Sequence, residues 1–281
     1  MPDKDPMFLR KKLSAALHSA RARSGYSQLE VAEAMVWSLS KVMRVETGKV
    51  KISVTDLRAL IDYYDISETE ASELIQMAQQ ARRLPWWHEY RGLLSEGFQS
   101  YLGYEASALT IRNFEVTLIP GLLQTEEYAR VVLQKSVVPQ KEELLELRMR
   151  RQERLMETPS EVGLFFIIDE SAMRRVVGSE AVMKAQHSRL MEFNELPHVS
   201  VRIVPFSSGM YPLLRSPYVI FDFPDPAQDR VVYLENPDGS VVIRDKATLG
   251  IHRTTEDYLE AFWEVENSFS APVGSAHDFF G

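Results

Sequence analysis

The spacing of hydrophobic residues in the first third of the chain predicts a series of short helices. Apolar positions recur every three or four residues, which is the spacing of one buried helical face. Serine or threonine opens several of these segments and glycine closes others, as expected for helix caps. The predicted helices cover residues 9–23, 28–35, 39–46, 57–64 and 69–83. This part of the chain is therefore expected to form an all-α domain of five helices.

The second and third predicted helices form a unit with clear boundaries. Ser27 and Glu30 have the spacing of a capping box, in which each side chain satisfies a free amide at a helix start. Ser38 is a second capping residue, and Gly48 ends the third helix because glycine readily adopts the left-handed conformation. Two short helices joined by a tight turn can place the second one in the major groove of DNA. The pattern predicts a helix-turn-helix.

The residues of this unit resemble the repressor-type helix-turn-helix family, often called the XRE or lambda-repressor-like family. The resemblance rests on Ser27-Gln28, Ala32, Ser38, Ser40, Arg44, Glu46 and Gly48-Lys49. It implies a DNA interface made by Gln28, Ser38, Leu39, Ser40, Lys41, Arg44 and Lys49. In that interface Gln28 and Lys49 would hold phosphates, Leu39, Ser40 and Arg44 would face base edges, and Lys41 would do either. Val36 stands where the family usually has a turn glycine. The alternative is a helical hairpin that only packs in a core.

The same resemblance implies an ion pair inside the N-terminal domain. Arg21 and Glu46 occupy the two positions at which the family links its first helix to the recognition helix. An unpaired buried charge is costly, so each of these residues is expected to need the other.

Beyond residue 84 the pattern changes to mixed helices and strands. Leu84-Pro85 interrupts the helical spacing, because proline disfavours helix in the residue before it. Helices are predicted at 125–135, 141–157, 181–196 and 255–267, and strands at 162–168, 199–204, 218–223, 231–235 and 241–244. The predicted fold class is α+β, with a helix-turn-helix domain at 7–84, a mixed α/β domain at 85–269 and a loosely held tail at 270–281.

The C-terminal part resembles a second family, the large domain of uncharacterised function that follows this helix-turn-helix in many actinobacterial regulators. The matching stretches include Trp87 to Tyr90, Phe98 to Glu105, Ile119 to Thr125, Arg151 to Leu155, Asp169-Glu170 and Ile203 to Phe206. Both resemblances in this order imply a transcriptional regulator, without indicating its ligand.

Charge is distributed unevenly along the chain. The formal net charge is -8, but residues 9–51 carry nine Lys or Arg against three Glu, a net charge of +6, which leaves -14 for the rest. A basic end on an acidic protein suits binding a polyanion at that end. The chain has no cysteine, which excludes disulfides, and its longest apolar run, 162–168, is far below the roughly 20 residues that span a bilayer. We expect a cytoplasmic protein with no membrane contact.

The motifs of several enzyme classes are missing from the sequence. There is no phosphate-binding loop, no dinucleotide-binding glycine motif and no nucleophile elbow. The six histidines lack the spacing of helical metal ligands. We therefore expect no catalytic residues, no metal and no cofactor.

Three features of the C-terminal part leave alternatives open. Arg148, Arg151 and Arg154 on one predicted helix suit an anion pocket or, alternatively, a solvated face paired with nearby glutamates. Asp169-Glu170 suits a helix cap better than an acid pair, because adjacent strand residues point to opposite faces. Trp86 and Trp87 suit packing between domains or, alternatively, a groove that binds a ligand or partner.

The sequence as a whole predicts a DNA-binding transcriptional regulator. Its C-terminal domain is expected to dimerise the protein and to bind a ligand or a small protein partner, which in the resembled family is often acidic. One alternative is an antitoxin-like module whose main act is to neutralise such a partner. A third hypothesis, an enzyme directed to DNA, lacks a catalytic constellation in the sequence.

Overall fold

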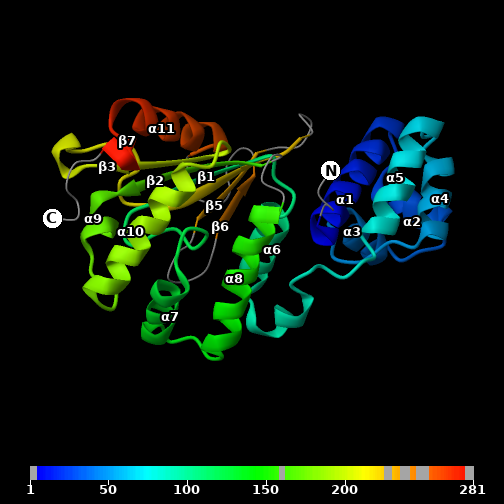
Figure 1. Cartoon of the computed structure of the whole chain (residues 1–281). Helices are drawn as coiled ribbons and strands as arrows, with labels where there is room; N and C mark the ends of the chain where they lie inside the picture. The colour runs from blue at the N-terminus through cyan, green and yellow to red at the C-terminus, as the bar shows by residue number, and fades with distance from the viewer. Residues whose placement is uncertain (1–4, 158–161, 225–229, 235–240, 245–252, 276–281) are drawn as a thin grey trace. The chain divides into compact units, whose positions relative to one another are not determined.

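A computed structural model describes residues 5–157, 162–224, 230–234, 241–244 and 253–275 (Figure 1). The chain forms two compact units, one ending at His88 and the other beginning at Glu89, called here the head and the body. Trp87 belongs to the head, where its indole nitrogen donates to Asp5 Oδ2 at 3.1 Å. The division therefore falls shortly after the expected boundary at residue 84. No helix among the described residues has the length and apolarity needed to cross a membrane.

The head consists of the five predicted helices. They are α1 (Pro6–Ser24), α2 (Gln28–Ala34), α3 (Leu39–Glu46), α4 (Val54–Tyr63) and α5 (Glu68–Gln80). Serine side chains cap α2 to α5, and Gly25 ends α1 with a φ of 76°. Each of these serine side chains accepts a hydrogen bond from a backbone amide that the first helical turn leaves free. The predicted bounds of the second and third helices, which depend on these local signals, agree with the structure to within one residue. Helices α1 and α4 each begin three residues earlier than predicted, and α5 ends three residues earlier.

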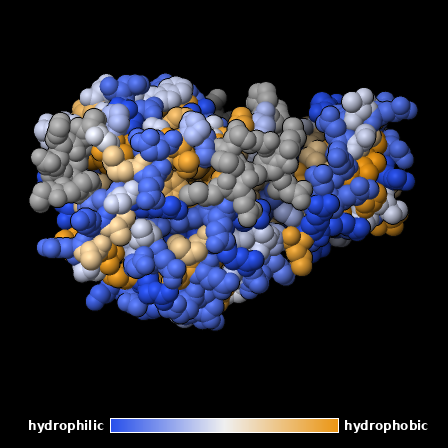
Figure 2. All heavy atoms as spheres, in the orientation of Figure 1, coloured by the Kyte–Doolittle hydropathy of each residue, from blue (hydrophilic) through white to orange (hydrophobic). Residues whose placement is uncertain are grey.

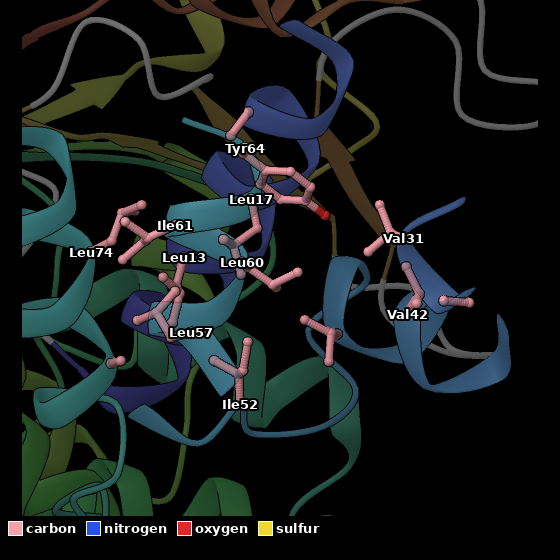
Figure 3. Packing of buried hydrophobic residues seen from close by; sticks show 14 residues of the cluster. Leu13, Leu17, Val31, Val42, Ile52, Leu57, Leu60, Ile61, Tyr64 and Leu74 are labelled. Atoms are coloured by element: carbon pink, nitrogen blue, oxygen red, sulfur yellow. The ribbon is translucent and has the colours of Figure 1, made fainter. Parts of the chain in front are cut away.

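A single hydrophobic core joins all five helices of the head. Figure 3 shows side chains from distant parts of the segment meeting in it, including Leu17 of α1, Val31 of α2, Val42 of α3, Leu57 of α4 and Leu74 of α5. All five are at most 2% exposed. Because α2 and α3 contribute to the same core as α1, α4 and α5, the helix-turn-helix is held in one orientation within the head.

The body is built on a seven-stranded mixed sheet. Its strands are β1 (Thr110–Glu115), β2 (Gly163–Asp169), β3 (Val199–Val204), β4 (Tyr218–Asp222), β5 (Val231–Leu234), β6 (Val241–Arg244) and β7 (Ala271–Pro272). Their order is β6-β5-β4-β1-β2-β3-β7. The central strands β1, β2 and β3 are parallel, with Phe114 opposite Ile167, and the remaining pairs are antiparallel.

Helices cover both faces of this sheet (Figure 1). They are α6 (Glu96–Glu105), α7 (Glu126–Lys135), α8 (Lys141–Glu157), α9 (Glu170–Arg174), α10 (Glu180–Asn194) and α11 (Thr255–Ser268), with 3-10 turns at His88–Leu93, Phe206–Ser208 and Val273–Ser275. Alternation along β4 shows the two layers: Ile220 packs in the cluster that contains Phe262 of α11, whereas Phe221 meets the Tyr101 ring of α6. Successive strand residues point to opposite faces, so both faces are apolar.

The α+β class is confirmed, with three differences in detail. The central strand β1 and helix α6 were not predicted. The segment after Ser270, expected to be loose, instead adds β7 to the edge of β3, and Val273 is buried. Residues 276–281, the rest of the expected tail, lie outside the described residues.

Candidate nucleic-acid interface

The turn between α2 and α3 closes without glycine. Val36 has a φ of 55°, in the left-handed region, and its side chain is 92% exposed. The turn is closed by a hydrogen bond from Trp37 N to Ala32 O at 2.8 Å. A β-branched residue in this conformation is strained. Packing of α2 and α3 in the core therefore imposes the turn geometry on a residue that disfavours it.

Helix α3 separates a buried side from an exposed side. Val42 and Val45 are 2% and 3% exposed and pack in the core. Ser40 and Arg44 lie on the exposed side, where Arg44 Nε donates to Ser40 O at 3.3 Å. Leu39 is 42% exposed. Lys49 follows the helix end and is also exposed. The predicted base-contacting residues Leu39, Ser40 and Arg44 thus share an accessible surface.

Arg21 and Glu46 form a bidentate ion pair that connects α1 to the end of α3. Arg21 Nε lies 2.6 Å from Glu46 Oε1, and Nη2 lies 3.1 Å from Oε2. Arg21 Nη1 also donates to Tyr26 O at 2.8 Å, ahead of α2. Burial tends to raise the pKa of Glu46, but hydrogen bonds from Arg21 and Gln28 hold it below its ordinary value. The pair therefore fixes the orientation of α3 from the side opposite its exposed residues.

Gln28 and Lys41 both have partners within the head. The Gln28 side-chain amide donates to Glu46 Oε2 at 2.7 Å, so it supports the ion pair. The Lys41 ammonium lies 3.7 Å from the centre of the Trp37 ring and 3.0 Å from Asp56 Oδ2 on α4. These partners connect Lys41 to α4, and its side chain is 35% exposed. Ser38 caps α3 by accepting from Lys41 N at 3.2 Å.

The arginines of α8 do not assemble one anion pocket. Arg151 is buried and bidentate to Glu105 of α6, at 2.9 and 2.6 Å. Arg148 donates to the Gln124 side chain at 2.5 Å, and Arg154 is exposed. The alternative of a solvated face paired with glutamates of the same helix is also wrong for Arg151. Its partner lies 46 residues earlier in the chain, and nothing in the helical spacing of α8 indicates it.

Asp169 and Trp87, two further candidate residues, also have partners within their own units. Asp169 caps α9 by accepting from Ser171 N at 2.8 Å, as predicted, and accepts from the Tyr211 hydroxyl at 2.6 Å. Trp87 is 1% exposed, which contradicts its use as a wall of a groove, while Trp86 is partly buried. Within the described ranges, no three His, Asp or Glu side chains gather closely enough to hold a metal ion.

Sequence reasoning missed two features of the head. Met43 is 49% exposed and lies four residues after Leu39, on the same side of α3. Its spacing from Leu39 was the available signal. Trp37 and Asp56, which hold Lys41, carried no signal because Asp56 meets α3 only through the packing of α4.

The architecture and this surface define a helix-turn-helix protein. Residues 12–74 match a family model described as a helix-turn-helix domain. Residues 98–262, more than half of the chain, match the model described as a domain of unknown function, DUF5753, so the chain belongs to that family. No curated protein and no solved structure matches the chain.

Proposed function

We propose that this protein is a sequence-specific DNA-binding transcriptional regulator of the XRE type. The carrying observation is that α3 presents Leu39, Ser40 and Arg44 outward while the Arg21–Glu46 pair and the core hold the helix from behind. A helix docked in the major groove reads base edges only if it is held in a fixed orientation. The net charge of +6 over residues 9–51 favours approach to the phosphate backbone.

The proposal includes a dimer formed through the body. A small helical domain makes few phosphate contacts, and nonspecific binding by such modules is typically about 10⁻⁴ to 10⁻⁶ M at physiological salt. Two joined heads would reach half-sites about 34 to 36 Å apart, one turn of duplex. The body belongs to the DUF5753 family and lies in the part of the chain that carries the net charge of -14. Its role in the proposal is to dimerise in the cytoplasm and to bind a ligand or small protein partner, without a catalytic step.

Selection from a library of random duplexes with the full-length protein tests DNA recognition. An enriched sequence motif is expected, with two half-sites one helical turn apart. Light scattering of the free protein is expected to give the mass of a dimer. Failure to enrich any motif would refute sequence-specific binding.

A split of the chain tests the role of the body. The head, cut after His88, is expected to bind the selected operator more weakly than the full chain, and residues 89–281 are expected to remain dimeric. The cut keeps Trp87 with its Asp5 partner. A monomeric body, or a head that binds as tightly as the full chain, would contradict the dimer while leaving DNA recognition intact.

A further inference from the structure

The exposed side of α3 carries two parallel stripes of different chemistry. Ser40 and Arg44 form a polar stripe, joined by the hydrogen bond from Arg44 Nε to Ser40 O. Leu39 and Met43 form an apolar stripe beside it, with 42% and 49% of their surfaces exposed. Residues four apart lie one above the other on a helix, so each pair forms a continuous strip.

The apolar stripe is not part of the core of the head. Val42 and Val45 already supply the contacts of α3 with that core, and among the described residues the cluster they belong to includes neither Leu39 nor Met43. Figure 2 shows that, on the face in view, exposed hydrophobic residues form small patches within a mainly hydrophilic surface. Packing in the core of the head therefore does not explain these two large apolar side chains at adjacent turns of one short helix.

Two polar side chains near this stripe have partners within the head. Of the two cations on α3, Lys41 is held by Trp37 and Asp56, whereas Arg44 is exposed. The Gln28 amide is bonded to Glu46. The exposed side of α3 thus presents one guanidinium and one serine hydroxyl on the polar stripe, and two hydrophobic side chains on the apolar stripe.

The occupant of this surface must suit both stripes. Arg44 and Lys49 are both exposed, and residues 9–51 carry a net charge of +6, so an anionic occupant is favoured over a neutral apolar one. The major groove of DNA offers phosphates along its edges and one apolar group on its floor, the 5-methyl group of thymine. Leucine and the polarizable methionine side chain both pack well on a methyl group.

From this geometry we propose that Leu39 and Met43 read thymine 5-methyl groups, so that each operator half-site carries T·A pairs beneath the apolar stripe. The inference rests on the proposed DNA-binding function and adds the bases that the protein selects. Arg44, on the neighbouring stripe, faces an adjacent base pair or phosphate.

Removing methyl groups from the DNA tests the inference without altering the protein. In the duplex selected by the full-length protein, each thymine is replaced in turn by deoxyuridine, which keeps every hydrogen-bonding group of the base. At the positions read by Leu39 and Met43, affinity is expected to fall about fourfold per methyl group, which corresponds to about 0.8 kcal/mol for one buried methyl group. Unchanged affinity at every replaced thymine would overturn the inference.

Variants of the two side chains assign the contacts. Leu39→Ala is expected to abolish the thymine-to-uridine difference at one position and Met43→Ala at another, while each leaves the other position unchanged. The control is Leu29→Ala, which removes a leucine of α2 that is 56% exposed and should preserve both differences. If both differences persist in Leu39→Ala and Met43→Ala, another group reads the methyls and the inference is wrong.

These outcomes are separable from failure of the proposed function. If the selection enriches no motif, the proposed function of sequence-specific DNA binding is wrong. An enriched motif without thymine, or with thymines that are insensitive to demethylation, leaves DNA recognition standing and removes only the role of the apolar stripe, as would be expected if that stripe instead docked a protein.

Discussion

A bidentate arginine–glutamate pair occurs in both the head and the body, partly buried in the first and buried in the second, and the two pairs serve different purposes. In the head, the Arg21 and Glu46 side chains are 13% and 4% exposed. In the body, the Arg151 and Glu105 side chains are 7% and 6% exposed. The chemistry and geometry are nearly the same, so the difference lies in what surrounds each pair.

The pair of the head has additional polar partners. Tyr26 O accepts from Arg21, and the Gln28 amide donates to Glu46, so parts of α1, α2 and α3 meet at one point. The pair of the body lies instead beside two stacked aromatic rings: the Arg151 guanidinium carbon is 5.4 Å from the Phe98 ring centre and 5.2 Å from that of Tyr101. Burial lowers the pKa of Arg151, but Glu105 outweighs this and raises it.

The two pairs therefore differ in function: the pair of the head orients a helix, and the pair of the body holds two helices together. A buried ion pair contributes little net stability compared with a well-packed apolar pair, yet losing one partner is strongly destabilising. In the head the pair fixes the direction of a helix whose far side is exposed. In the body it joins α6 to α8 inside the fold. Variants of the two pairs should therefore differ in whether DNA binding is affected.

The largest effect is expected from breaking the pair of the body. Arg151→Ala leaves the Glu105 carboxylate buried without its partner and removes the packing on two rings, so it should destabilise the body by about 3 to 5 kcal/mol. Hydrogen exchange of the α6 and α8 amides during urea titration measures the loss. Arg154→Ala, at an exposed position of the same helix, should change stability by less than about 0.5 kcal/mol. Equal losses in the two variants would show that Arg151 has no special role.

The pair of the head should show coupling between its members. Arg21→Ala and Glu46→Ala are each expected to destabilise the head by roughly 3 kcal/mol, and the double variant should lose less than the sum. Both single variants should also weaken operator binding, because α3 loses its orientation. Additive losses in a denaturation cycle would contradict the coupling.

Acid should weaken the same pair. The pKa of Glu46 is depressed in the folded head, so its contribution to stability is present above the ordinary carboxyl pKa of 4.5 and is lost as pH falls through the lower folded value. Glu46→Gln should flatten the pH dependence of head unfolding in this acid range. An unchanged slope in that variant would assign the acid sensitivity to other carboxylates.

An exposed arginine of the head should affect recognition but not folding. Arg44→Ala is expected to weaken binding to the selected operator by about 1 to 3 kcal/mol if Arg44 makes a bidentate contact with guanine, with little loss on a scrambled duplex. Lys49→Ala, the matched variant at a predicted phosphate contact, should weaken binding to both. Titration of each variant against both duplexes distinguishes the roles. Equal losses for Arg44→Ala on the two duplexes would make Arg44 a phosphate contact.

The smallest effect is a gain in stability at the turn. Val36→Gly relieves a left-handed β-branched residue, and although glycine is more flexible in the unfolded chain, the head should gain about 0.5 to 1 kcal/mol. Val36→Ala retains a Cβ atom and should gain less. Thermal unfolding of the head measures both. A loss of stability in Val36→Gly would show that the exposed valine side chain is itself stabilising.

Most helices and strands could be predicted from the sequence, but the centre of the sheet could not. The strand Val199–Val204 was predicted with its observed bounds because apolar residues dominate it. The central strand β1 was not predicted, because it carries Arg112 and Asn113 among its apolar residues. Those polar groups are accommodated only by distant partners: Arg112 pairs with Asp222, and the Asn113 amide donates to Tyr218 O.

The sequence by itself determined the helix-turn-helix of this protein. Its caps at Ser27 and Ser38 and its end at Gly48 depend on groups within one helical turn, and such local signals operate in any tertiary context. The Arg21–Glu46 pair was expected only through resemblance to a known family. Tertiary structure alone decided that Lys41 turns to Asp56 and Arg151 to Glu105, because each choice depends on a helix brought close by packing. Side chains that can reach several partners are assigned by the fold as a whole, and no local pattern contains that information.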